Sequence, residues 1–206
     1  LQEDHGTGDI TSLATIPLDH SSKGIVHVKE DGVLAGLPVA EAVFAEVDPS
    51  LRFRPLIEDG MFAAKGTVIA EVEGSSRSIL AGERLALNML QRLSGVATRT
   101  RQFVEALDGI QVRLVDTRKT TPGHRMLEKY AVRIGGGHNH RFGLYDAVMI
   151  KDNHIKASGG IAAAIANARA HIPHTMKIEV ETESLDQVEQ ALQAGADIIM
   201  LDNMPL

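Results

Sequence analysis

The stretch "MKIEVETESLDQVEQALQAGADIIMLDN", residues 176–203, holds two short apolar runs with a helix-length segment between them. The runs "KIEV" and "DIIML" are rich in isoleucine and valine, which is typical of strands that are buried on both faces. In the segment between them, Ser184 followed by Gln187 is the pattern of a capping box, and Gly195 suits the position just after a helix. The stretch therefore predicts strand, helix and strand, which is a right-handed crossover between parallel strands.

The same alternation extends toward the N-terminus. "DAVMIKD" (146–152) predicts a strand and "GGIAAAIANARA" (159–170) predicts a helix. "QVRLVDT" (111–117) and "AVRIGGG" (131–137) are two further apolar runs, which we interpret as strands. Strands that alternate with helices predict an α/β domain with a parallel sheet.

The first part of the chain, residues 1 to about 82, has a different pattern. "KGIVHVKEDGVLAG" (23–36) and "EDGMFAAKGTVIAEVEG" (58–74) each predict a strand followed by a turn, and the second returns as another strand. "LPVAEAVFAEVD" (37–48) has helical spacing and stops before a proline. We expect an α+β part with antiparallel strands and one helix.

A long helical pattern, "AGERLALNMLQRLSGVATRTRQFVEAL" (81–107), joins the two parts. Ser94-Gly95 predicts a break in this helix or a tight contact there. We place the domain boundary here, with an N-terminal domain at 1–95 and an α/β domain at 96–206. The apolar stripe of the helix is predicted to comprise Leu85, Met89, Leu93, Val96, Phe103 and Leu107.

The composition excludes several classes of function. Lys and Arg number 21 against 27 Asp and Glu, and aromatic residues make up 3% of the chain, so we expect no nucleic-acid partner. There is no cysteine, which excludes disulfides and thiolate metal sites. No apolar run approaches the roughly 20 residues of a membrane span, so we expect no membrane partner. The N-terminus has no signal-peptide pattern. Because the sequence starts at Leu1 and not at a methionine, we expect that it was cut from a longer chain.

Polar residues gather where the predicted strands end. In parallel α/β folds these carboxyl ends meet at the site. Arginine binds carboxylate or phosphate in a bidentate manner and lysine adds a mobile charge, so these ends suit a ligand with several anionic groups. A solvated loop is the alternative for Arg118 and Lys119, but cations recur at three strand ends. The ends carry Thr117-Arg118-Lys119, Gly135 to Arg141, Lys151-Asp152, Glu179 with Glu181, and Asp202-Asn203.

Other features of these ends have competing interpretations. His138 and His140 could ligate a metal, but no third ligand of matching type is evident. The glycines before them permit close approach of the backbone to a ligand, without forming a dinucleotide fingerprint. Glu181 and Asp202 could hold ribose hydroxyls or a magnesium-bound pyrophosphate.

Several long motifs in sequence order resemble the quinolinate phosphoribosyltransferase family, the decarboxylating type II enzymes, over essentially the whole chain. The motifs are "GDITS" (8–12), "AGERLALNMLQRLSGVAT" (81–98), "DTRKTTPGHR" (116–125), "EKYAVRIGGGHNHRFGLYDAVMIKDNHI" (128–155), "KIEVE" (177–181) and "GADIIMLDN" (195–203).

The resemblance implies an N-terminal open sandwich followed by an open parallel α/β barrel, in a cytoplasmic homodimer or dimer-based oligomer. In the family the barrel continues past "LDN" with a glycine-rich stretch for the 5-phosphate. We therefore expect an incomplete barrel that is truncated at its C-terminal end. A fragment with an unpaired parallel edge should be unstable or prone to aggregation.

The resemblance also implies roles for individual residues. Arg118, His140 and Arg141 would hold the two carboxylates of quinolinate, and Thr117 would position the pyridine. Lys119 and Lys151 would face both quinolinate and phosphoribosyl pyrophosphate (PRPP). Arg84 would reach into the partner subunit's site. Glu181 and Asp202 would lie on the ribose and magnesium-pyrophosphate side. The catalytic residues would be Lys119, Lys151, Glu181 and Asp202, with Mg²⁺ as the cofactor that accompanies PRPP.

The implied reaction transfers phosphoribosyl from PRPP to quinolinate with decarboxylation, giving nicotinate mononucleotide, pyrophosphate and CO₂. One alternative is a related phosphoribosyltransferase, for nicotinate or of the molybdenum-transport type. Cations at three strand ends favour a dicarboxylate over a monocarboxylate. Another alternative is a non-catalytic anion-binding module.

Overall fold

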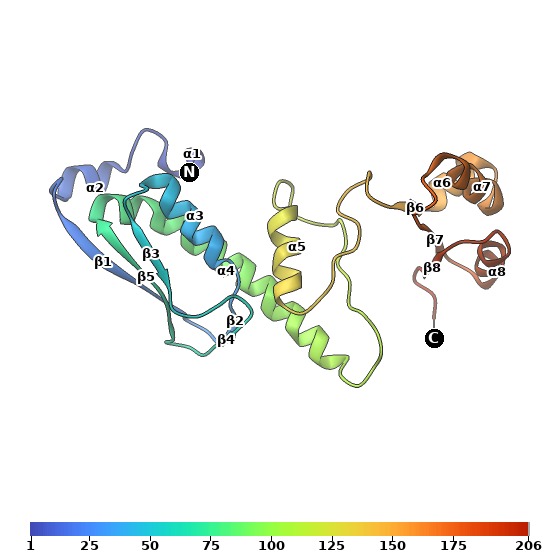
Figure 1. Cartoon of the computed structure of the whole chain (residues 1–206), viewed down its shortest axis with the longest axis horizontal. Helices are drawn as coiled ribbons and strands as arrows, with labels where there is room; N and C mark the ends of the chain where they lie inside the picture. Colours follow the sequence, from blue (N-terminus) through green and yellow to red (C-terminus); the bar gives the residue numbers. More distant parts are fainter. Residues whose placement is uncertain (206) are drawn as a thin grey trace. The chain divides into compact units, whose positions relative to one another are not determined.

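The computed structural model of the chain describes residues 1–205, which form two compact units. The first unit comprises Leu1–His140 and the second begins at Arg141; Figure 1 labels the helices and strands of both. Residue 95, where we predicted the domain boundary, lies inside a helix, and that boundary stays a prediction. Within residues 1–205 no helix combines the length and apolar character needed to cross a membrane.

The N-terminal part of the first unit is built on an antiparallel sheet, on which helices α3 and α4 pack (Figure 1). The sheet has the strand order β1-β5-β3, and a second, two-stranded sheet pairs β2 with β4. Besides the predicted helix α3, two short helices precede the sheet, of which α2 is capped by the Asp9 carboxylate. The elements are α1 (Gln2–His5), α2 (Ile10–Thr15), β1 (Ser21–His27), β2 (Gly32–Val33), α3 (Leu37–Val47), β3 (Arg52–Pro55), β4 (Phe62–Ala63), β5 (Val68–Ser75) and α4 (Ser76–Ala106).

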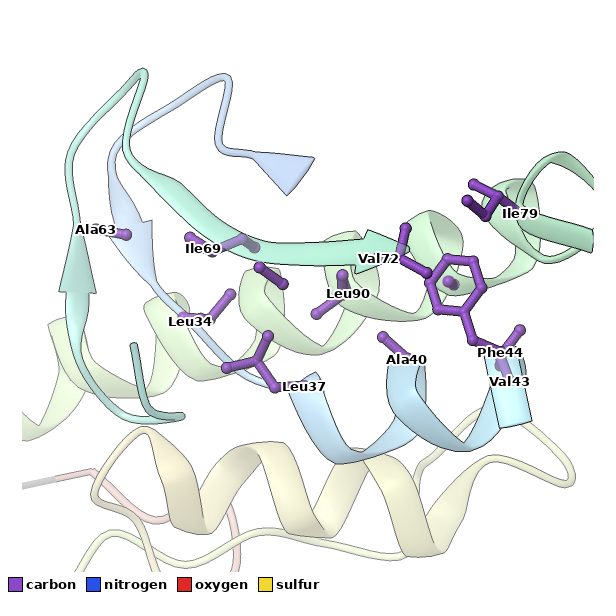
Figure 2. Close-up of a cluster of buried hydrophobic side chains, with 12 residues drawn as sticks. Leu34, Leu37, Ala40, Val43, Phe44, Ala63, Ile69, Val72, Ile79 and Leu90 are labelled. Atoms are coloured by element: carbon purple, nitrogen blue, oxygen red, sulfur yellow. The ribbon is translucent and has the colours of Figure 1, made fainter. Parts of the chain in front are cut away.

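The core of this part lies between the three-stranded sheet and helices α3 and α4 (Figure 2). Phe44 of α3 stacks on Phe53 of β3, with 5.7 Å between ring centroids. A Cβ atom on Gly82 of α4 would lie 2.9 Å from Cδ1 of Phe44, so only glycine allows α3 and α4 to approach so closely. The remaining buried members include Leu34, Leu37, Ala40, Val43, Ile69, Val72, Ile79 and Leu90.

Helix α4 is continuous over 31 residues, which corrects the predicted break at Ser94-Gly95. The Ser94 hydroxyl accepts from the Ala35 N–H at 3.0 Å and donates to the Ala35 carbonyl at 3.2 Å, so a tight contact does occur at this serine. A Cβ atom on Gly95 would meet nothing within 4 Å. The helix is therefore held here by a side-chain contact and continues without a break.

The buried stripe of α4 also differs from the predicted one. Of the predicted residues Leu93 is fully buried, whereas Phe103 is 47% exposed. The stripe is built from smaller side chains because neighbouring helices pack closely against α4. It consists of Ser76, Ile79, Gly82, Ala86, Leu90, Leu93, Ala97 and Thr100.

Two of the predicted strands are wrong. The run 111–117 forms a single isolated bridge, through Val115, instead of a strand. The run 131–137 is the end of helix α5 (Arg125–Ile134) and the turn after it. Leu127, Ala131 and Ile134 recur at helical spacing and pack against the core around α4, which outweighs the strand preference of a short apolar run.

The second unit confirms the predicted alternation of strands and helices. Its strands are parallel and lie in the order β6-β7-β8. Ser184 caps α8 by accepting from the Gln187 N–H at 3.3 Å, while the Gln187 side chain accepts from the Glu183 N–H at 2.7 Å, one residue earlier than in a full capping box. The elements are β6 (Val148–Ile150), α6 (Asp152–Ser158), α7 (Ile161–His171), β7 (Ile178–Thr182), α8 (Leu185–Gln193) and β8 (Ile198–Leu201).

Candidate functional site

Two segments of the first unit that carry predicted site residues lie side by side. Val115 and His138 form a parallel bridge. The Asp116 N–H donates to the His138 carbonyl at 3.0 Å, and the His138 N–H donates to the Leu114 carbonyl at 2.8 Å. This pairing brings the residues that follow Asp116 next to the segment 138–140.

A buried ion pair joins these two segments. The Lys129 Nζ lies 2.5 Å from the Asp116 Oδ1, and the two side chains are 2% and 8% exposed. The same carboxylate oxygen accepts from the His140 N–H at 2.8 Å, and the lysine also donates to the His140 carbonyl at 3.1 Å. With its amide nitrogen turned toward Asp116, Asn139 donates to the second carboxylate oxygen at 3.0 Å. The buried charges are thus both paired and hydrogen-bonded, as burial requires.

Three predicted cationic side chains of the first unit, those of Arg84, Arg118 and Lys119, form no ion pair with another residue that the structure describes. Thr117 Oγ1 accepts from the Lys119 N–H at 3.0 Å, which shapes the backbone around Arg118. Arg118 is half-buried, whereas Lys119 and Arg84, the latter on α4, are exposed. Within residues 1–205 none of these three cationic groups has an acidic partner. Their charges are therefore available for an anionic ligand.

The glycines before His138 pack against a helix. A Cβ atom on Gly135 would lie 2.5 Å from the Ala97 carbonyl oxygen, and one on Gly137 would lie 3.0 Å from Cγ2 of Thr100. Both contacts are with α4, and the predicted approach of this backbone to a ligand stays a prediction. These glycines therefore set the distance between α4 and the end of α5.

The two histidines of this segment lack further metal ligands in the part of the chain that the structure describes. His138 is exposed and His140 is half-buried. Within residues 1–205 there is no group of three His, Cys, Asp or Glu side chains that could hold a metal ion. This arrangement gives no support to the alternative of a histidine metal site.

In the second unit the strand ends bring predicted residues together. Lys151 follows β6, and its Nζ lies 2.5 Å from the Glu181 Oε2 at the end of β7. Asp202 follows β8, where its N–H donates to the Thr182 carbonyl at 2.8 Å, and its side chain is exposed. A cation and two carboxylates therefore lie along one edge of the parallel sheet.

The second unit begins with a compact loop at Arg141. Its guanidinium donates to the Ala147 carbonyl at 3.3 Å. The Asp146 carboxylate accepts from the N–H groups of Phe142 and Gly143 at 2.6 and 2.8 Å. These backbone hydrogen bonds hold the pKa of Asp146 below its usual value. The loop is thus fixed by one carboxylate while Arg141 lies beside it.

Helix α5 makes a second, half-buried polar contact at the residue after Lys129. The Tyr130 hydroxyl donates to the Asp59 Oδ2 at 2.5 Å. The Asp59 carboxylate also accepts from the N–H groups of Gly36 and Leu37, at 2.6 and 3.1 Å, where α3 begins. Burial, followed by the hydrogen bond to Asp59, raises the pKa of Tyr130. The tyrosine therefore acts as a neutral donor that ties α5 to the start of α3.

Lys129 and the partner role of Asp116 were not predicted from the sequence. Because the run after Lys129 was interpreted as a strand, this lysine was not expected to face the site. One signal was available: Asp116 follows an apolar run directly, and an acid at such a position needs a partner if it is buried.

Comparisons with known proteins cover nearly the whole chain. The profile of the quinolinate phosphoribosyl transferase N-terminal domain matches residues 9–94, and that of the C-terminal domain matches residues 96–206. The chain is 50% identical to a probable nicotinate-nucleotide pyrophosphorylase [carboxylating] of Synechocystis sp. over 204 residues, which are 99% of this chain and 69% of the relative. It is also 50% identical to the probable nicotinate-nucleotide pyrophosphorylase [carboxylating] of Bacillus subtilis, covering 98% of this chain and 70% of that one.

Solved structures agree with this assignment. The crystal structure of NadC from Streptococcus pyogenes matches with a TM-score of 0.95 at 49% identity, covering 100% of this chain and 73% of that one. The nicotinate-nucleotide pyrophosphorylase from Francisella tularensis matches with a TM-score of 0.93 at 42% identity, covering 99% and 72% of the two chains. The α/β fold, the order of the motifs and these similarities agree, and the chain belongs to the quinolinate phosphoribosyl transferase family.

Proposed function

We propose that the protein transfers the phosphoribosyl group of PRPP to quinolinate, with decarboxylation, to give nicotinate mononucleotide, pyrophosphate and CO₂. The observation that carries this proposal is the 50% identity, over 99% of the chain, to a nicotinate-nucleotide pyrophosphorylase [carboxylating]. The unpaired cations of the segment 117–119 support it, because quinolinate is a dicarboxylate.

For quinolinate, the proposal assigns the two carboxylates to Arg118, His140 and Arg141, with Thr117 positioning the ring. Arg118 supplies a planar fork of N–H donors that matches a carboxylate. The His140 N–H donates to the Asp116 carboxylate and the His140 carbonyl accepts from the Lys129 ammonium, which supports a fixed position for this residue. In this proposal His140 would meet the dicarboxylate from a backbone position that the buried pair of Asp116 and Lys129 holds.

The transfer step forms a bond between the pyridine nitrogen and C1 of the ribose. The bond from C1 to the pyrophosphate oxygen breaks, and its electron pair leaves with pyrophosphate. We propose that Lys119 and Lys151 stabilise the charges of both substrates. Glu181, held 2.5 Å from Lys151, would face the ribose side, where positive charge develops on the sugar.

Decarboxylation then breaks the bond to the carboxylate next to the ring nitrogen. The electron pair remains on the ring carbon, where the adjacent positive nitrogen stabilises it, and a proton replaces CO₂. This step needs no nucleophilic side chain from the protein. The contribution of the chain is therefore to orient the ring and to neutralise the remaining carboxylate.

Magnesium fits the carboxylates of the second unit. Mg²⁺ prefers oxygen ligands and is usually held by one or two carboxylates together with substrate phosphates. Glu181 and Asp202, at neighbouring strand ends, offer such oxygens. We propose that they hold Mg²⁺ on the pyrophosphate side, where the ion would neutralise the charge of the leaving group.

The test is turnover of quinolinate and PRPP, followed by nicotinate mononucleotide formation and by release of labelled CO₂. Equal amounts of both products support the proposal. Product from nicotinate without CO₂ release would instead indicate a nicotinate phosphoribosyltransferase. Binding of quinolinate and PRPP without any turnover would indicate a non-catalytic anion-binding module.

We also propose a homodimer in the cytoplasm, with an open α/β barrel, in which Arg84 serves the partner's site. The exposed position of Arg84 on α4 supports this role. In a mixture of Arg84→Ala and Arg118→Ala proteins, half of the dimers would be mixed and would have one intact site. Refolding the mixture should therefore restore about one quarter of the wild-type activity. If the mixture stays as inactive as its components, Arg84 does not act across a dimer.

A further inference from the structure

The segment that carries Arg118 and Lys119 is not ordered by its own backbone. Within residues 1–205, no backbone–backbone hydrogen bond involves residues 117–120. This segment also belongs to no helix or strand. Its conformation must therefore be set by side chains, which are the Thr117 hydroxyl within the segment and side chains of α5.

One face of α5 contacts the segment at several points. Arg125, Glu128 and Lys129 are three and four residues apart, so they project from the same side of the helix. The guanidinium of Arg125 donates to Thr120 Oγ1 at 3.1 Å and to the Arg118 carbonyl at 3.4 Å. These contacts hold the middle of the segment.

Glu128 holds the far end of the segment. Its Oε2 accepts from the Thr121 N–H at 3.1 Å, and its Oε1 accepts from the Arg92 Nε of α4 at 3.0 Å. The Arg92 guanidinium also donates to the Thr121 hydroxyl. The side chains of Glu128 and Arg92 are 13% and 46% exposed, so the carboxylate of this ion pair is largely shielded from water while the guanidinium is partly solvated.

Lys129 holds the near end, through the pair with Asp116. The same ammonium reaches the His140 carbonyl, so one buried cation touches both segments that are proposed to bind quinolinate. Adjacent residues of a single helix thus fix both ends of a six-residue segment, residues 116–121. Ordering a segment before the ligand arrives lowers the entropic cost of binding.

We propose that Glu128 and Lys129 are positioning residues for quinolinate, which hold the segment 116–121 so that Arg118 and Lys119 meet the dicarboxylate in a fixed geometry. This inference rests on the proposed function. It assigns no contact with the substrate to either residue. Their effect passes through the backbone of the segment and of His140.

The test measures the dissociation constant of quinolinate by calorimetry, without PRPP, together with KM for quinolinate. Glu128→Ala and Lys129→Met should each weaken binding by about 10- to 100-fold, the loss expected when a binding group is misplaced by about an ångström. The matched control is Tyr130→Phe, which removes a hydrogen bond from α5 to Asp59 but leaves the segment untouched. It should lower the melting temperature and leave the quinolinate affinity within about twofold, since it removes no contact with the segment.

If Lys129→Met does not fold, Asp116→Asn/Lys129→Met replaces it, because the double change removes both buried charges. The double variant should fold, but its affinity for quinolinate should remain below that of the wild type. The reason is that a methionine side chain cannot donate a hydrogen bond to the His140 carbonyl. Affinities within about twofold of wild type in Glu128→Ala and in the lysine variant would overturn the inference, and so would equal weakening in Tyr130→Phe. If the wild-type protein itself does not bind quinolinate, the proposed function fails and the inference fails with it.

Discussion

The buried pair of Asp116 and Lys129 predicts a large effect on stability when one partner is removed. In Lys129→Met the length of the side chain is nearly kept, but the Asp116 carboxyl loses its cationic partner in a place where it is 8% exposed. Removal of one partner of a buried ion pair costs about 3–5 kcal/mol of unfolding free energy. Because the chain has 206 residues, this loss corresponds to a fall of about 6–20 °C in the melting temperature.

Equilibrium unfolding in urea, followed by circular dichroism, measures this loss directly. The double variant Asp116→Asn/Lys129→Met leaves no buried charge, and the asparagine oxygen can still accept from the His140 N–H. It should be more stable than Lys129→Met, with a coupling energy of about 2 kcal/mol or more between the two sites. A loss below about 1 kcal/mol in Lys129→Met, which is the range of an exposed pair, would refute the inferred burial of the pair.

Three further predictions concern binding, backbone geometry and pH. Arg118→Ala should weaken quinolinate binding strongly in a calorimetric titration, and an unchanged affinity would show that the assigned pocket is wrong. Gly95→Ala should raise the unfolding free energy by about 0.5–1 kcal/mol, because a Cβ atom there meets nothing within 4 Å; Gly135→Ala should lower it, because a Cβ atom would lie 2.5 Å from a carbonyl oxygen of α4. Burial alone would raise the pKa of Glu128, but its hydrogen bonds from Arg92 and Thr121 lower it overall. The stabilisation from Glu128 should therefore be present above pH 4.5, its ordinary value, and be lost as the pH falls through the lower folded value. Unfolding free energies of wild type and Glu128→Ala at neutral and acidic pH should converge on the acidic side, and a constant difference would contradict this assignment.

The second unit was predictable because its signals are local. The runs at 146–152 and 197–203 are apolar, short and separated by helices whose caps are visible in the sequence. Each strand also has an immediate neighbour in chain order, so the pairing follows from the crossover rule. The placement of Lys151, Glu181 and Asp202 on one edge of the sheet was predicted from the same rule.

The region 111–137 was not predictable in this way. Whether "AVRI" is a strand or a helix depends on contacts with α4, and these are distant in sequence. The same is true of Lys129, because a lysine in the sequence does not reveal that its ammonium is buried against Asp116. Likewise, the buried stripe on α4 depends on how closely α3 and α5 approach this helix. The close approach buries small residues, such as Gly82, Ala86 and Ala97, in place of some larger residues that the hydrophobic spacing predicted.

The unbroken helix α4 also limits how the length of this protein can vary. Its first half packs against α3 and its second half against α5. Because α4 is one continuous helix, the angle about its axis between the face that contacts α3 and the face that contacts α5 is fixed. A single inserted or deleted residue near Ser94 would turn every later position by about 100° about the helix axis. Arg92 would then keep its position. Ala97 and Thr100 would rotate away from the turn that follows α5 and lose their contacts with it. Length changes among relatives should therefore collect in the loops on either side of α4 and be absent from its middle.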